Sequence, residues 1–230
     1  MKRFYKSAST HFTGKDFEVR LDDRPVRTPG RNMLKFPTLA LAEASAAEWN
    51  NQGEKLVITD MPITTLAYAT TDRVAANPEH FIQTVAKFAE TDLLCYRATD
   101  PKALRDRQDE LWDPLLKWFK TQFGENFAVT EGIMPIDQPE KTTAAVITAL
   151  RTLDHFHLTS AHSTAELTGS AVIALALTKR EISASDAFNA AHIDDYFQLE
   201  EWGEDHEAQL RLNQRKAELN EIGNFLNLLN

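Results

Sequence analysis

The N-terminal part of the chain alternates apolar and polar residues with the period of a β-strand. Phe17, Val19 and Leu21 alternate with charged residues, which is typical of a strand with one buried face. The polar turn at 22–25 ends this run, so we expect a hairpin. A second short apolar segment at 33–36 is another strand candidate.

A helical spacing of apolar residues replaces this alternation further along the chain. The apolar residues of 39–49 recur every few positions and Thr38 precedes them as an N-cap, so we expect a helix with Trp49 on its inner face. Residues 55–58 return to a strand-like pattern, and 62–74 predicts a short helix.

Proline and its neighbours mark several helix starts. Residues 77–79 read Asn-Pro-Glu, which combines a cap, a proline at the first helical position and an acid that complements the helix dipole. Asp-Pro pairs recur at 100–101 and 113–114, the second inside a continuing helical pattern, where proline should kink or restart the helix. We therefore interpret Asp113 as a helix cap and Trp112 as a buried anchor.

The same signals predict four further helices. They are a helix at 139–154, one at 167–177 after a capping box of Ser163 and Glu166, one after a capping box of Ser183 and Asp186, and an amphipathic helix from Gly203 to the C-terminus. Together the elements predict an α+β fold. A small β-rich N-terminal domain with one helix, at 1–75, precedes a larger, mainly α-helical C-terminal domain at 76–230.

Charge is spread unevenly over the 230 residues. The formal net charge is −9, of which residues 1–80 carry +1 and residues 81–230 carry −10. Such an acidic half excludes nucleic acid as a natural partner and favours a basic protein surface. The single cysteine, Cys95, excludes an intrachain disulfide. The longest apolar run, 167–177, is about half the length of a membrane span, so we expect no membrane insertion.

Acids and aromatics are concentrated between residues 193 and 211. From 181 to 207 there are nine Asp or Glu and no Lys or Arg. If this stretch is one helix, Glu200, Glu204 and Glu207 share a face and repel one another. The interleaved aromatics include Phe197 and Trp202. The stretch is either an interaction surface or a solvated helix face whose aromatics point inward.

Motifs for catalysis or cofactor binding are not found in the sequence. There is no phosphate-binding glycine loop, and Asp154 with His157 is the one pair with helical metal-ligand spacing, so we expect no cofactor and no metal. No nucleophile motif involves Cys95. Paired carboxylates such as Glu200 and Glu204 would do acid–base chemistry if a cleft raised one pKa. A carboxylate-dependent hydrolase is therefore the alternative function.

Seven segments, in order and over nearly the whole chain, together resemble the ATP synthase F1 assembly chaperones that bind the α subunit. They are RFYK from Arg3, VRLDDRPVRTP from Val19, LALAEASAAEWNNQ from Leu39, MPITTLA from Met61, TDLLCYRA from Thr91, QDELWDPLLKW from Gln108 and FQLEEWGEDHEA from Phe197. This resemblance implies a chaperone without enzymatic activity that holds the F1 α subunit until the β subunit replaces it. It also implies a small β-rich domain before a larger helical one.

The resemblance further implies a cytoplasmic bacterial form, because RFYK is where the folded domain of the family begins. We expect such a chain to act as a monomer. The acidic stretch then becomes the partner-binding site, in which the acids meet basic groups of α while the aromatics cover its apolar surface. The candidate binding residues are Phe197, Glu200, Glu201, Trp202, Glu204, Asp205 and Glu207. Trp49 and Asp113 also match family positions, which burial and capping explain.

Overall fold

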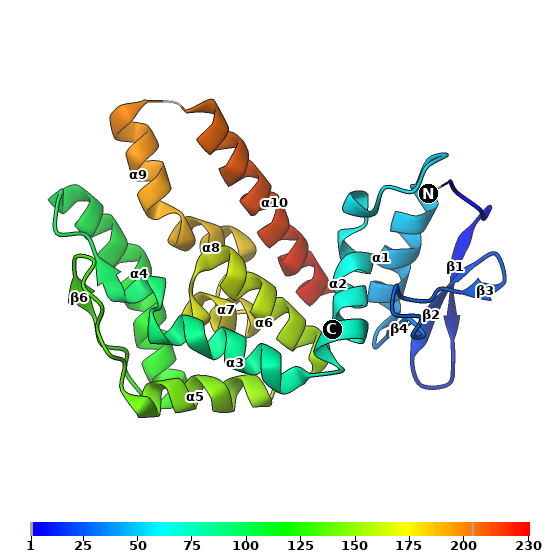
Figure 1. Cartoon of the computed structure of the whole chain (residues 1–230), viewed down its shortest axis with the longest axis horizontal. Coiled ribbons are helices and arrows are strands. Elements are labelled where there is room, and N and C mark those ends of the chain that lie inside the picture. Colours follow the sequence, from blue (N-terminus) through cyan, green and yellow to red (C-terminus); the bar gives the residue numbers. More distant parts are fainter. Residues whose placement is uncertain (1, 204) are drawn as a thin grey trace. The chain divides into compact units, whose positions relative to one another are not determined.

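The computed structural model describes residues 2–203 and 205–230. Short strands near the N-terminus are followed by a mainly helical chain, which confirms the predicted α+β class (Figure 1). The chain divides into two compact units: unit 1 comprises Met1–Pro78 with Asn224–Asn230, and unit 2 comprises Glu79–Gly223. Whether residues 1–75 and 76–230 fold as separate domains remains a prediction. In the described part of the chain no helix has the length and apolar character needed to cross a membrane.

Unit 1 contains a small antiparallel sheet centred on β2. Its strands are β1 (Ala8–Phe12), β2 (Phe17–Leu21), β3 (Arg24–Pro25) and β4 (Lys35–Phe36). The other three strands all pair with β2, and the β1–β2 register places Ala8 opposite Leu21 and Phe12 opposite Phe17. The hairpin predicted at the 22–25 turn is confirmed as β2–β3, in which Leu21 pairs with Arg24. Val19 is fully buried, as the alternation requires.

Helix α1 (Leu39–Asn50) packs against this sheet. The Thr38 side chain accepts a hydrogen bond from the Leu41 amide, which confirms the predicted N-cap. Trp49 is 5% exposed, and its ring meets the Tyr5 ring edge-on with the centroids 5.6 Å apart. The Tyr5 hydroxyl also donates to the Trp49 carbonyl. Trp49 is thus the anchor between α1 and the N-terminal segment.

The predicted strand at 55–58 is wrong. Lys55 forms an isolated bridge with Lys2, and a 3-10 turn, η1 (Ile58–Asp60), follows. The Gln52 side chain accepts the Val57 amide hydrogen at 2.7 Å, so it takes a donor that a strand partner would need. The predicted helix at 62–74 is confirmed as α2 (Pro62–Ala69) continued by a π-helical turn, η2 (Thr70–Val74).

Unit 2 is built around α7 (Ala171–Thr178), all eight residues of which are buried. Helices α4, α5, α6 and α8 contact it. Two short strands, β5 and β6, pair in parallel beside α4. The remaining elements are α3 (Pro78–Glu90), η3 (Leu93–Cys95), β5 (Tyr96–Arg97), α4 (Lys102–Phe123), β6 (Thr130–Glu131), α5 (Glu140–Arg151), α6 (His155–Thr168), α8 (Ala184–Ala191), α9 (Ile193–Trp202) and α10 (His206–Asn227).

The predicted capping box before α7 is wrong. Ser163 lies inside α6, whose N-cap is Asp154, with the side chain accepting from the His157 amide. Gly169 ends α6 with a φ of +69°, a conformation that glycine adopts without strain. Ser170 then caps α7. The Ser183–Asp186 capping box of α8, by contrast, is present as predicted.

Helix α4 runs through Pro114 as a single element, so of the two predicted outcomes, a kink or a restart, the restart is wrong, and Asp113 is not a helix cap. Packing holds the two halves together, because Trp112 and Leu115 are buried on either side of the proline. The Asp113 carboxylate instead accepts from the buried Arg97 guanidinium at 2.6 Å. The Trp112 Nε1 donates to the Ala190 carbonyl at 2.7 Å, which confirms the buried anchor.

A fully buried carboxylate, Asp92, joins η3 to the start of α7. It accepts hydrogen bonds from the Leu94 amide and the Val172 amide, each at 3.1 Å. Burial raises the pKa of Asp92 to about 6, in spite of hydrogen bonds from Ser170 and these amides, which lower it. Asp92 therefore supplies acceptors where water cannot reach.

Substitution Asp92→Ala should lower the free energy of unfolding by on the order of 3 kcal/mol, because two buried amides lose their acceptor. The folded-state pKa lies above the ordinary value of 3.8, so the folded chain binds the proton more tightly. The stabilisation by Asp92 therefore falls as pH rises from about 4 to about 6. Urea unfolding at both ends of this range should show the larger loss at the acid end. Asp106→Ala, at an exposed pair with Lys102, is the control; a loss independent of pH would contradict the raised pKa.

Substitution Trp49→Arg should destabilise the chain by about 3–5 kcal/mol, because it places an unpaired charge in the core of unit 1. Thermal or urea unfolding measures the effect. The same change at Trp202, which is 81% exposed, should stay within about 0.5 kcal/mol. Equal stability of the two variants would show that Trp49 is not part of the core.

Candidate functional site

The acidic stretch folds as two helices joined by a short turn. Helix α9 ends at Trp202, Gly203 follows with a φ of +92°, and α10 begins at His206 (Figure 1). The predicted alignment of three acids on one helix is therefore wrong: Glu200 and Glu207 lie on different helices, and Glu204 lies outside the described residues. The glycine conformation explains the break, because other residues rarely adopt it.

A groove of about 570 Å³ lies between α9 and α10. Leu199, Ala208 and Leu212 give it an apolar lining, and Trp202 stands at one end with 81% of its surface exposed. Both charge signs also occur in the lining. The lining residues are Asp195, Gln198, Leu199, Trp202, Gly203, Asp205, Ala208, Arg211, Leu212 and Arg215. We call this the α9–α10 groove.

Two of the predicted binding residues are engaged within the protein. The Glu200 carboxylate forms a salt bridge with Arg107 of α4, with Oε2 and Nη1 2.7 Å apart. The same guanidinium lies over the Phe197 ring, 5.3 Å from its centroid, and Phe197 is 7% exposed. The counter-charge that is missing locally thus comes from a residue 93 positions away. Because Phe197 is buried, it packs beneath the surface of α9 and its ring is not exposed for contact with a partner.

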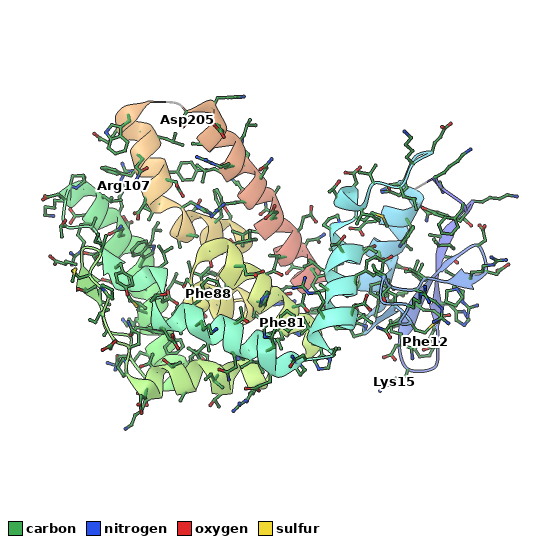
Figure 2. All side chains as sticks on the ribbon, in the orientation of Figure 1. Phe12, Lys15, Phe81, Phe88, Arg107 and Asp205 are labelled. Carbon is green, nitrogen blue, oxygen red and sulfur yellow. The ribbon has the colours of Figure 1, made fainter. Side chains whose placement is uncertain are left out.

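The other acids lie at the turn. Glu201 and Glu207 are exposed, and neither forms a salt bridge among the residues that the structure describes. Asp205, labelled in Figure 2, is exposed as well. Its Oδ1 accepts from the Glu207 amide at 2.9 Å and from the Ala208 amide at 3.3 Å, so Asp205 is the N-cap of α10. Asp205 therefore has a folding role beside any role in binding.

Two acids at the start of α9 have opposite pKa shifts. Burial raises the pKa of Asp194, which accepts from the Gln108 side chain at 2.7 Å. The hydrogen bond to His192, 2.8 Å long, is the main cause that lowers the pKa of Asp195, and two arginines of α10 lower it further. Asp194 therefore belongs to the packing against α4, whereas Asp195 faces the groove.

Several site residues were not identified from the sequence. Arg211 and Arg215 share the helical face of Ala208, a spacing of three and four residues that could have revealed them. No sequence pattern connects Arg107 to Glu200. The family-motif residues Trp49, Trp112 and Asp113 do not line this groove. Trp49 lies in α1 of unit 1, and Trp112 and Asp113 lie in the middle of α4.

Catalytic chemistry finds little support in this arrangement. Glu200 is held in a salt bridge with Arg107 and more than half of its side chain is exposed, so it does not lie in the enclosed cleft that the hydrolase hypothesis requires. Within residues 2–203 and 205–230, no three His, Cys, Asp or Glu side chains are grouped so as to hold a metal ion. The exposed aromatic and acidic groups are instead suited to contact with another protein.

Comparison with known proteins decides the family. The family described as "ATP12 chaperone protein" matches residues 2–120, just over half of the chain. The chain belongs to the ATP12 chaperone family. This confirms the resemblance to the ATP synthase assembly chaperones.

Solved structures extend the match over the whole chain. The crystal structure of Atp12 from Paracoccus denitrificans is 35% identical, with a TM-score of 0.94, and the match covers 100% of this chain and 98% of that one. A chain from Agrobacterium tumefaciens is 36% identical with a TM-score of 0.93, covering 100% of this chain and 86% of that one. Mitochondrial atp12 of Schizosaccharomyces pombe is 22% identical over 214 residues, 88% of this chain and 74% of that protein. The α9–α10 hairpin, beyond residue 120, is thus part of the shared fold.

The two acids that flank the turn should differ in their effect on folding. Asp205→Ala should lower the free energy of unfolding by about 1 kcal/mol, because α10 loses its cap. Glu201→Gln should leave it unchanged or raise it slightly, because an acid near the C-terminal end of α9 is unfavourable to the helix dipole. Urea unfolding of both variants is the measurement. If Glu201→Gln lowered the free energy of unfolding as much as Asp205→Ala, Glu201 would be shown to stabilise the fold.

Proposed function

We propose that this ATP12-family chain binds the unassembled α subunit of F1-ATPase and holds it until the β subunit replaces it. It acts without enzymatic activity, as a monomer in the bacterial cytoplasm. The observation that carries the proposal is the exposure of Trp202 beside acids that have no ion-pair partner within the described part of the chain.

Trp202 contributes little to the core at 81% exposure. Tryptophan is among the residues that most often supply binding energy at protein interfaces, because it buries a large area when a partner covers it. A surface that presents this side chain at the end of a hairpin is suited to an apolar patch that the α subunit would bury only after assembly.

The charge around Trp202 favours a basic partner surface. Glu201, Asp205 and Glu207 surround the turn, and the chain as a whole carries −9. Complementary charge accelerates association and selects against acidic partners. Exposed charges are screened beyond about 8 Å at physiological ionic strength, so binding should weaken as salt increases.

The alternative hydrolase is less well supported. It requires one carboxylate with a raised pKa in a cleft, whereas Glu200 is paired with Arg107 and exposed. Its other proposed group, Glu204, lies outside the described residues. The chaperone function requires no cleft around these acids, because it uses them as surface groups that face a partner.

Removing the exposed groups should weaken binding to purified F1 α while leaving folding intact. Trp202→Ala should raise the dissociation constant about tenfold or more, as expected for an interface anchor. The double variant of Glu201→Gln with Glu207→Gln should raise it several-fold, with a smaller effect at high salt. Titration calorimetry or surface plasmon resonance with the isolated α subunit measures both.

Matched controls are available on the same unit. Ile133→Ala removes an apolar side chain that is 94% exposed, and Glu181→Gln removes an exposed acid; both lie outside the groove lining. Neither should change α binding by more than about twofold. Binding that is unaffected by Trp202→Ala and by the double variant would exclude this surface as the site.

A further inference from the structure

The α9–α10 groove changes the sign of its charge along its length. Asp205 lies at the turn, whereas Arg211 and Arg215 follow on α10, about 9 and 15 Å further along at 1.5 Å per residue. The acidic character predicted from the sequence therefore describes the turn and not the whole groove. Any ligand that lies along the groove meets an acidic end and a basic end.

The arginines at the basic end are only partly neutralised. Both act electrostatically on Asp195, whose pKa they lower. Asp195 is also hydrogen-bonded to His192, and no salt bridge to either arginine is found within the described ranges. Arg215 makes one long hydrogen bond, 3.4 Å, to the Leu167 carbonyl. Among the lining residues at this end, two cations face one acid; Glu207 and Glu218 lie four and three residues from these arginines on α10 but do not line the groove.

Apolar side chains separate the two charged ends. Leu199 and Leu212 line the groove from opposite helices, with Ala208 between the acidic turn and the arginines. The small alanine leaves room beside them, and Trp202 borders the same space. This middle section is suited to an apolar side chain.

We propose that the groove binds one segment of the partner in a fixed direction. A basic group of the segment meets Asp205 at the turn, an apolar side chain contacts the half-buried Leu199 and Ala208, and an acidic group pairs with Arg211 and Arg215. The proposal rests on the proposed function for the identity of the partner, the F1 α subunit. It adds that recognition needs an acid on the partner, which an entirely acidic site would repel.

Charge reversal at the basic end tests this direction. Arg211→Glu should weaken binding to the isolated F1 α subunit about tenfold or more, because a partner acid then meets an acid. Lys117→Glu changes the net charge equally, at an exposed position of α4 outside the groove lining. It should alter binding by about twofold at most. Arg211→Ala removes the charge without reversing it and should give an intermediate loss; circular dichroism verifies that each variant is folded.

The opposite result is equally clear. If the groove takes only basic groups, Arg211→Glu should bind as tightly as Lys117→Glu or more tightly, and the proposed direction is overturned. Failure of the parent chain to bind the α subunit would overturn the proposed function as well. Parent binding with no selective effect at Arg211 would overturn the groove proposal alone.

A cross-link identifies the segment directly. Gln198 is exposed and lines the groove, and the native Cys95 is fully buried, with a thiol pKa raised by burial. Gln198→Cys can therefore carry a photoreactive group selectively. In the complex with the α subunit, mass spectrometry should find a cross-linked peptide that has an apolar residue between a basic residue and an acidic residue. A cross-linked peptide without an acidic residue would contradict the proposal.

Discussion

The amide groups at the buried N-terminus of α7 must find hydrogen-bond acceptors within the protein, and the rest of unit 2 depends on this. A helix buried along its entire length has amide groups at its N-terminus that water cannot satisfy. The Ser170 side chain accepts from the Ile173 amide, and the carboxylate of Asp92, the N-cap of η3, accepts from the Val172 amide. Without these acceptors the helix would lose several hydrogen bonds in its most buried turn. The helices that pack on α7, α4 among them, take their positions from it.

Helix α4 connects the buried core around α7 to the candidate site. Three of its side chains bind successive points between α8 and the end of α9. Trp112 binds the Ala190 carbonyl, Gln108 binds Asp194, and Arg107 binds Glu200. Figure 2 shows Arg107 at the end of α4 beside α9. The last of these contacts ends two residues before Trp202, which explains how a rigid helix can present an exposed aromatic side chain at its tip. The candidate site is therefore fixed by the core even though its own residues contribute little to stability.

Most local signals could be predicted from the sequence, and long-range pairings could not. The Thr38 cap and the Ser183–Asp186 capping box join residues three positions apart and are present, whereas the same pattern at Ser163 and Glu166 falls inside α6. Asp113 carries the same cap-like signal before a proline, but its partner is Arg97, a buried cation that nothing in its neighbourhood indicates. Glu200 likewise lacks a local counter-charge and receives one from Arg107. The sequence singled out the acidic segment as a candidate site, but it did not show that Glu200 is paired within the protein.

The mixture of acids and an exposed aromatic answers two opposing requirements of a chaperone surface. An exposed tryptophan promotes association with any apolar surface, including a second copy of the same chain. Acids around it, together with a net charge of −10 over residues 81–230, repel such copies. In the proposed function the same charges attract a basic partner, so the groups that keep copies of the free chain apart would also select what it binds. Replacing the acids with apolar residues would strengthen non-specific association but remove this selection. The exposed tryptophan and the repelling acids are therefore needed at the same turn.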